Sequence, residues 1–176
     1  MKKIVLGLVA LLILAVGVFV FVNAKDSYDP SKYFVDAKNG LAVGSTIDFK
    51  LPDQFDKPHS LDEDTKLLIV VFAKDTAHVV KEYLKDKPKG FLEEKNALFI
   101  ADISPMPVII RNAFAMPDLK KSSYTILLIY DKNIASKLKN DKNQDKINIV
   151  YLQNKKIKDI KYISTQKELD DILNSI

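Results

Sequence analysis

The chain has 176 residues, with 27 lysine and arginine residues against 23 aspartate and glutamate residues and a formal net charge of +4. Lysines and acids alternate throughout and Arg111 is the only arginine, so nucleic-acid binding is disfavoured. The length predicts one ordinary domain. There is no cysteine. Thiol-disulfide exchange, peroxidase activity through a thiolate, and iron-sulfur clusters are therefore excluded.

The first 24 residues predict an export signal or a membrane anchor. Met1-Lys2-Lys3 precedes an uninterrupted apolar run from Ile4 to Val22. This run fits a membrane span of about 17–25 residues better than the core of a cleaved signal, about 7–15 residues. Val22-Asn23-Ala24 also fits a signal-peptidase site, so residues 1–24 are either retained as an anchor or removed.

In both cases the two N-terminal lysines stay in the cytoplasm and the rest of the chain is exported. We therefore expect a single-pass protein of the cell membrane, anchored through residues 4–22. Its C-terminal domain would be periplasmic or extracellular. Cleavage would instead give a soluble periplasmic protein.

The exported part is expected to begin with a tether and a β-hairpin. Residues 25–43 are polar and predict a tether with a short strand at Tyr33–Val35. The domain then occupies residues 44–176. Thr46–Leu51 alternates polar and apolar residues, as in a half-buried strand, and His59–Leu61 forms the return strand.

A strand-helix-strand unit follows. Leu67–Ala73 is a short, continuous apolar run, which is typical of a strand buried on both faces, and Ala97–Ile103 is the next buried strand. Between them, Asp75 or Thr76 is expected to cap a helix. The apolar stripe of this helix consists of Val79, Val80, Tyr83 and Leu84. Such a unit predicts a right-handed crossover between parallel strands.

The second half repeats strands and helices. Pro107 is expected to start a helix that runs toward Pro117. Tyr124–Tyr130 predicts a third apolar strand, and Ile134–Leu138 predicts a short helix before a polar loop at 139–146.

The C-terminal part predicts a hairpin and a helix. Strands at Ile147–Leu152 and Lys156–Ile163 flank Asn154-Lys155. Thr165 and Glu168 then form a capping box that opens the last helix.

Polar side chains follow two of the predicted parallel strands. Asp75, Thr76 and His78 follow the first strand, and Asp102 and Ser104 follow the second. Open α/β sheets bind ligands at this edge, and helix N-termini favour anions. The plainer alternative is that these residues cap helices and turns and that the histidine lies on the surface.

Arg111 lies on the helix that Pro107 is expected to start. It would pair with Asp102 or hold an anionic ligand, or it is an isolated surface arginine. We regard six residues as ligand-binding or partner-binding candidates and assign none of them a catalytic role: Asp75, Thr76, His78, Asp102, Ser104 and Arg111.

Other kinds of site lack their motifs. No Gly-x-Ser-x-Gly is present for a hydrolase nucleophile. His59 stands near the acids at 62–64 without metal-ligand spacing, so no metal is expected. Gly40, Gly44 and Gly90 are too far apart for dinucleotide, flavin or P-loop sites. No cofactor is expected.

The order of the predicted elements resembles that of thioredoxin-like proteins. Gly44–Asp53 is similar to the start of peroxiredoxin-like and TlpA-like proteins, with a glycine, an alternating strand and a turn acid. Val71–Val79 falls where those proteins carry their redox motif, and Thr76 and Val79 stand at the places of its two cysteines. Their cis-proline precedes the third strand, whereas Lys121-Ser122-Ser123 stands there in this chain.

Cysteine-free members of this superfamily are closer in character, such as exported YtfJ-like proteins and mitochondrial ATP-synthase assembly factors. Shared elements are Ala101–Ser104 at a strand end, the strand Leu127–Asp131 and the capped C-terminal helix. The resemblance implies an α/β fold, a thioredoxin-like three-layer sandwich with a central mixed sheet, preceded by one transmembrane or signal helix.

A redox fold without its thiols favours a binding or assembly module for another envelope or membrane protein. The alternative is an enzyme of unknown type that uses Asp75, His78 and Asp102 as acid or base groups. A third hypothesis is a structural envelope protein without a discrete site.

Overall fold

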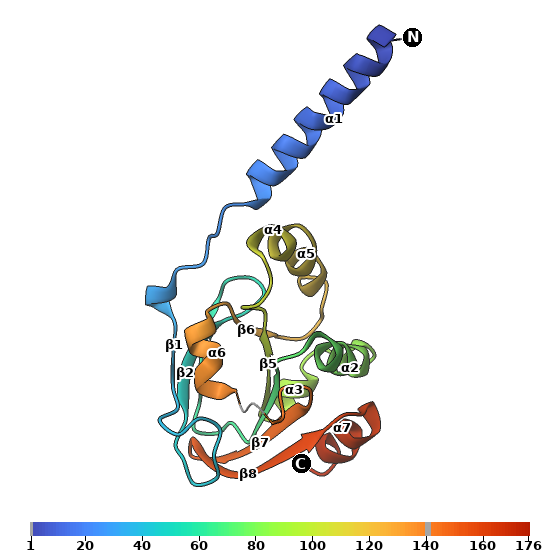
Figure 1. The fold of residues 1–176 in the computed structure, drawn as a ribbon. Helices are drawn as coiled ribbons and strands as arrows, with labels where there is room; N and C mark the ends of the chain where they lie inside the picture. Colours follow the sequence, from blue (N-terminus) through green and yellow to red (C-terminus); the bar gives the residue numbers. More distant parts are fainter. Residues whose placement is uncertain (1, 140–141) are drawn as a thin grey trace.

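A computed structural model describes residues 2–139 and 142–176 of the chain (Figure 1). Helix α1 (Lys2–Asn23) stands apart from the folded domain, and its apolar side chains are exposed. Its 22 residues extend about 33 Å, which matches the hydrocarbon core of a bilayer. Within the described residues, α1 is the one helix long and apolar enough to cross a membrane.

The main sheet is mixed and has five strands in the order β6-β5-β4-β7-β8. Strands β4, β5 and β6 are parallel, and β7 and β8 are each antiparallel to the preceding strand in this order. All five residues of β4 are buried, as expected of a central strand covered on both faces. The strands are β4 (Leu67–Val71), β5 (Ala97–Asp102), β6 (Leu127–Ile129), β7 (Ile147–Gln153) and β8 (Lys156–Ile163).

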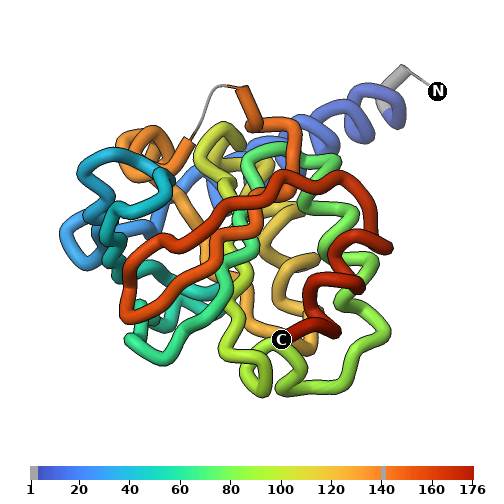
Figure 2. Tube along the Cα trace, turned by 90° about the horizontal axis from the view of Figure 1, so that it is seen from below, coloured from blue at the N-terminus to red at the C-terminus, as the bar shows by residue number. Residues whose placement is uncertain are grey.

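Helices cover both faces of this sheet. Helices α2 and α7 lie side by side on one face, together with α5 (Figures 1 and 2). A small sheet and α6 cover the other face, which gives three layers. The elements are α2 (Lys74–Lys85), α3 (Phe91–Glu94), α4 (Val108–Ile110), the π-helical turn η2 (Arg111–Ala115), α5 (Met116–Leu119), α6 (Lys132–Leu138) and α7 (Gln166–Leu173).

The small sheet has the order β1-β2-β3, with antiparallel strands β1 (Phe34–Asp36), β2 (Asp48–Pro52) and β3 (Pro58–Ser60). The β2–β3 hairpin was predicted from the alternating pattern. β1 overlaps the short strand predicted at Tyr33–Val35, within the segment 25–43 that was expected to be a tether. Its Val35 is buried, as are Ala37 and Leu41, so this stretch packs on the domain.

Two local predictions for the C-terminal part are confirmed. Asn154 and Lys155 form the β7–β8 turn with φ of 50° and 60°, the left-handed region that such tight hairpins use. Thr165 and Glu168 form the capping box at the start of α7, with each side chain bonded to the backbone of the other residue.

The N-cap of α2 differs from the prediction. The helix begins at Lys74 after Ala73, which forms no side-chain cap, so neither Asp75 nor Thr76 occupies the cap position. Both lie inside the first turn. There Thr76 is buried, and its hydroxyl donates a hydrogen bond to the Ala73 carbonyl at 2.9 Å.

The helix after β5 also differs. Pro107 is its N-cap, and the helix continues past Pro117 to Leu119. Its middle is a π turn, in which the Met116 N–H bonds to the Arg111 carbonyl five residues earlier. A proline inside a regular α-helix presses on the carbonyl four residues before it, and the wider turn accommodates the ring. We call residues 108–119 the α4–α5 helix.

Candidate functional site

The parallel strands end at one edge of the main sheet, where Asp102 terminates β5. The Asp102 side chain is fully buried, and its Oδ1 accepts a hydrogen bond from the Ser104 N–H at 2.9 Å. Its Oδ2 lies 2.7 Å from Lys139 Nζ. The Lys139 ammonium in turn lies 5.7 Å from the centre of the Phe72 ring. Asp102 is therefore held by a turn hydrogen bond and an ion pair.

The other candidates at this edge have different surroundings. Asp75 and His78 are exposed on α2, and Ser104 is buried. Among the described residues, no hydrogen bond or ion pair joins Asp75 or His78 to Asp102. Asp75, His78 and Asp102 therefore lack the mutual hydrogen bonds that usually orient the acid and base groups of an enzyme.

Arg111 is not a surface residue, contrary to one of the predictions. Its side chain is 4% exposed, and Nη2 donates to Asp26 Oδ1 at 2.6 Å. The guanidinium carbon lies 4.7 Å from the centre of the Tyr130 ring. Arg111 thus pairs with Asp26 near the end of α1, and the predicted pair with Asp102 is not formed, because Lys139 is the partner of that acid.

Residues 24–33, which we call the linker segment, follow α1 and reach this edge through Asp26 and Tyr28. Tyr28 stacks on Tyr130, just beyond the end of β6, with ring centres 4.8 Å apart and planes 8° apart. Its ring also stacks on Tyr33, at 5.7 Å and 11°. The segment therefore occupies part of the edge at which open α/β sheets commonly bind ligands.

Asn112, on the α4–α5 helix, bonds to the end of α1 and to the start of the same segment. Its Nδ2 donates to the carbonyls of Asn23, at 3.0 Å, and Lys25, at 2.9 Å. The last carbonyls of a helix lack partners within the helix. Asn112 supplies one to the last residue of α1 and so links the α4–α5 helix to that end.

Packing shifts the acidity of this cluster. Burial, followed by the nearby Asp131 carboxylate, raises the pKa of Tyr28 to about 12. Burial likewise raises the pKa of Tyr130. For Asp26, burial acts to raise the pKa, but the hydrogen bonds from Arg111 and the Tyr28 N–H outweigh it, so that the pKa is lowered.

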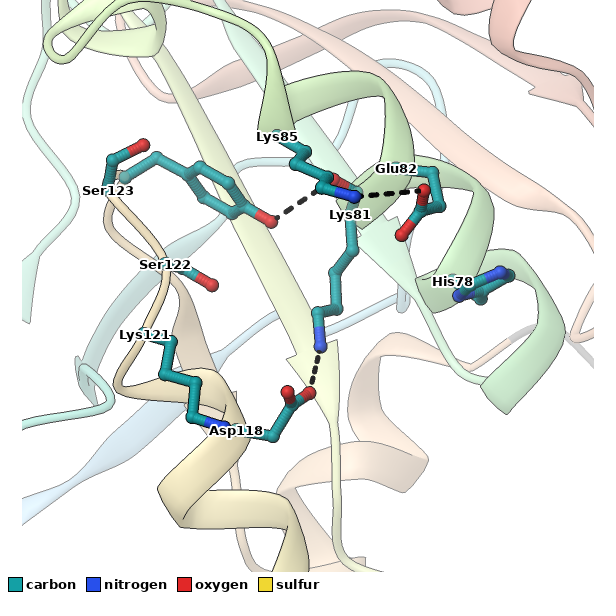
Figure 3. A pocket seen from close by; sticks show the side chains of 9 residues that line it. His78, Lys81, Glu82, Lys85, Asp118, Lys121, Ser122 and Ser123 are labelled. Atoms are coloured by element: carbon teal, nitrogen blue, oxygen red, sulfur yellow. Dashed lines mark hydrogen bonds and ion pairs between the residues drawn. The ribbon is translucent and has the colours of Figure 1, made fainter.

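An open groove of about 600 Å³ lies between α2 and the chain that links α5 to β6 (Figure 3). Lys81 reaches across it to Asp118, with 2.5 Å between Nζ and Oδ2. Lys85 lies 4.0 Å from Glu82 on the same helix. The lining residues are His78, Lys81, Glu82, Lys85, Asp118, Lys121, Ser122, Ser123 and Tyr124.

Sequence reasoning identified only His78 among these lining residues. The available signal was spacing, since 78, 81, 82 and 85 share one face of a helix. The position of the segment 118–124 opposite that face depends on how α5 packs.

His59 and Asp53 form a second polar cluster, at the β2–β3 hairpin. His59 Nε2 lies 2.9 Å from Asp53 Oδ2, while Asp53 Oδ1 accepts from the N–H groups of Phe55 and Lys57. Burial acts to raise the pKa of Asp53, but these bonds outweigh it and lower the pKa. No group of three or more histidines and acids within the described residues is arranged to hold a metal ion. The cluster stabilises a turn.

The fold is thioredoxin-like. A strand-helix-strand crossover places β5 parallel to β4, an antiparallel β7–β8 hairpin completes the other side of the sheet, and α7 packs back on the sheet. Thr76 and Val79, expected at the places of the two cysteines of a thioredoxin-like redox motif, lie on α2, and the chain contains no cysteine.

No protein-family model matches the chain, and no curated protein sequence matches it. Among solved structures it is similar to peroxidoxin BcpB from Mycobacterium tuberculosis, with 18% identity, coverage of 80% of this chain and 96% of that chain, and a TM-score of 0.48. A peroxiredoxin-like protein from Aquifex aeolicus gives 11% identity, 77% and 86% coverage and a TM-score of 0.49. The thioredoxin domain of a thiol-disulfide oxidoreductase from Bacteroides vulgatus gives 16% identity, coverage of 77% of this chain and 100% of that chain, and a TM-score of 0.46.

Proposed function

We propose that this protein is a membrane-tethered, extracytoplasmic binding or assembly module for another envelope protein. The apolar α1 with Lys2 and Lys3 at its start supports a retained anchor whose C-terminal domain faces away from the cytoplasm. The absence of cysteine removes the chemistry of the redox members of this fold.

One observation carries the proposal: the chain's own linker segment covers part of the strand-end edge. Tyr28 stacks on Tyr130 there, and Asp26 forms an ion pair with the guanidinium of Arg111. Asp102, the buried acid of this edge, is paired with Lys139. The two carboxylates of this edge and Nη2 of Arg111 are engaged in ion pairs within the chain, so recognition is better supported on an exposed surface.

The groove between α2 and residues 118–124 is that surface. It presents lysines and acids together, with the serine hydroxyls of 122 and 123. Interfaces with charges of both signs obtain specificity from complementary charges on the partner. The partner proposed is therefore a folded protein or peptide with a polar, mixed-charge face.

The test is crosslinking in intact membranes, followed by purification of the full-length chain. Reversing two rim charges, Lys85→Glu with Lys121→Glu, should lower recovery of a stoichiometric partner at least about tenfold, because like charges then face each other. The matched control is Lys158→Glu with Lys167→Glu, two exposed lysines on β8 and α7. Absence of a stoichiometric partner, or equal losses in both variants, would count against the proposal.

A further inference from the structure

The first two turns of the α4–α5 helix expose apolar side chains. Met116 and Leu119 point into the core and are buried. Yet Ile110 is 47% exposed and Phe114 is 60% exposed. A helix between a core and water normally carries polar residues on its outer side. These two side chains lie four positions apart and form an exposed apolar strip, a feature that often marks an interaction site.

This helix is fixed at the C-terminal end of α1. The Phe114 ring lies 6.3 Å from the Phe19 ring, centre to centre. Two residues before Phe114, the Asn112 amide donates to the carbonyl of Asn23, the last residue of α1. Figure 1 shows the α4–α5 helix at the part of the domain nearest to α1.

The contact with Phe19 sets a depth. Phe19 precedes the end of α1 by four residues, about 6 Å along the helix axis. When α1 spans a bilayer, Phe19 lies within the outer boundary of the hydrocarbon, and a ring beside it lies at the same boundary. Amphipathic helices that lie on membranes bury their apolar side about 5–10 Å into this zone.

We propose that the α4–α5 helix docks on the surface of the bilayer that α1 crosses, with Ile110 and Phe114 inserted at the headgroup boundary. This inference rests on the membrane anchoring included in the proposed function. Arg111 lies on the same helix, and its ion pair with Asp26 then holds the domain against the membrane in one orientation. The groove of α2 is thereby presented at a fixed angle to the membrane.

The chain contains no tryptophan, so single-tryptophan variants report one position each. Full-length Phe114→Trp, Ile110→Trp and Phe19→Trp variants are reconstituted in vesicles of phosphatidylethanolamine and phosphatidylglycerol, with and without brominated acyl chains. The matched control is Val43→Trp, at a residue that is 63% exposed outside the α4–α5 helix. We expect brominated chains to reduce emission by about half in the first three variants and to leave the control unchanged.

The outcomes separate the two proposals. Quenching of the F19W variant with no quenching of F114W and I110W overturns membrane docking and leaves the anchor standing. No quenching in any of these three variants overturns the anchor as well. Protection of F114W from acrylamide without quenching by brominated lipid means that a second copy or a partner protein covers the helix, which also overturns lipid docking. Far-UV circular dichroism identical to that of the unaltered chain confirms that each variant is folded.

Discussion

Arg111 and Asp26 are 85 residues apart in the chain and form an ion pair, with 2.6 Å between Nη2 and Oδ1. The guanidinium is buried, whereas the carboxylate is about half exposed. The pair joins the segment that follows α1 to the helix that follows β5. The domain is thus attached to α1 by side-chain contacts as well as by the chain itself.

Asp26→Asn should destabilise the domain, because it leaves the buried guanidinium of Arg111 without a carboxylate. We expect the free energy of unfolding to fall by about 1–2 kcal/mol, less than for a fully buried pair because water reaches the carboxylate. Urea denaturation of the full-length chain in mild detergent, followed by circular dichroism, measures this change. Asp29→Asn is the control, since Asp29 pairs with Lys32 on the surface. Equal effects of both substitutions would contradict the structural role of the pair.

The stacked tyrosines predict a loss of stability in alkali. The pKa of Tyr28 is about 12 in the folded chain because of burial and the Asp131 carboxylate, against about 10 in an unfolded chain. The packed state favours the neutral phenol. Its contribution is therefore complete below about pH 10 and is lost as the pH rises toward the folded value.

Tyr28→Phe keeps the ring stacks on Tyr33 and Tyr130 and removes the titrating group. Between about pH 9 and about pH 11, the unaltered chain should lose more stability in urea than this variant does. The comparison cancels the neutralisation of lysines, which both proteins share. Parallel loss in the two proteins would show that the phenol does not titrate against packing.

Much of the fold follows from local patterns in the sequence. Leu67–Ala73 and Ala97–Ala101 are apolar without interruption, which is typical of strands in a sheet covered on both faces. Thr165 and Glu168 specify their cap within four residues. These features depend on neighbours in the sequence, so the pattern is sufficient to predict them.

The surroundings of Arg111 could not be predicted in the same way. Its partner Asp26 lies in a polar stretch that has the composition of a linker, and no periodicity relates the two residues. The π turn was also not predictable. A proline in a sequence usually indicates the end of a helix, whereas Pro117 is accommodated within a packed helix that continues. Long-range pairing decides both features.

The buried side chain of Gln54 bonds to the backbone of the segment before β6, and removing these bonds should strongly destabilise the domain. Its Nε2 donates to the Tyr124 carbonyl at 2.8 Å, and its Oε1 accepts from the Ile126 N–H at 3.0 Å. Gln54→Met keeps the shape but removes both bonds, which should lower the free energy of unfolding by about 2–4 kcal/mol. Gln153→Met, at an exposed position of β7, is the control for urea denaturation. A loss no greater than that of the control would mean that water replaces these bonds.

The proposed topology predicts labelling from outside the membrane. The absence of native cysteine makes every introduced thiol unique. In cells whose inner membrane is intact, Val43→Cys should react with a membrane-impermeant maleimide, because Val43 is exposed on the part of the chain that the proposal places outside the cytoplasm. Ala135→Cys, fully buried in α6, should react only after denaturation. The labelled chain should remain in the membrane fraction with an intact mass that includes residues 1–24. Labelling of V43C only after the inner membrane is permeabilised would reverse the topology, and a mass that begins at Lys25 would show that the signal is cleaved.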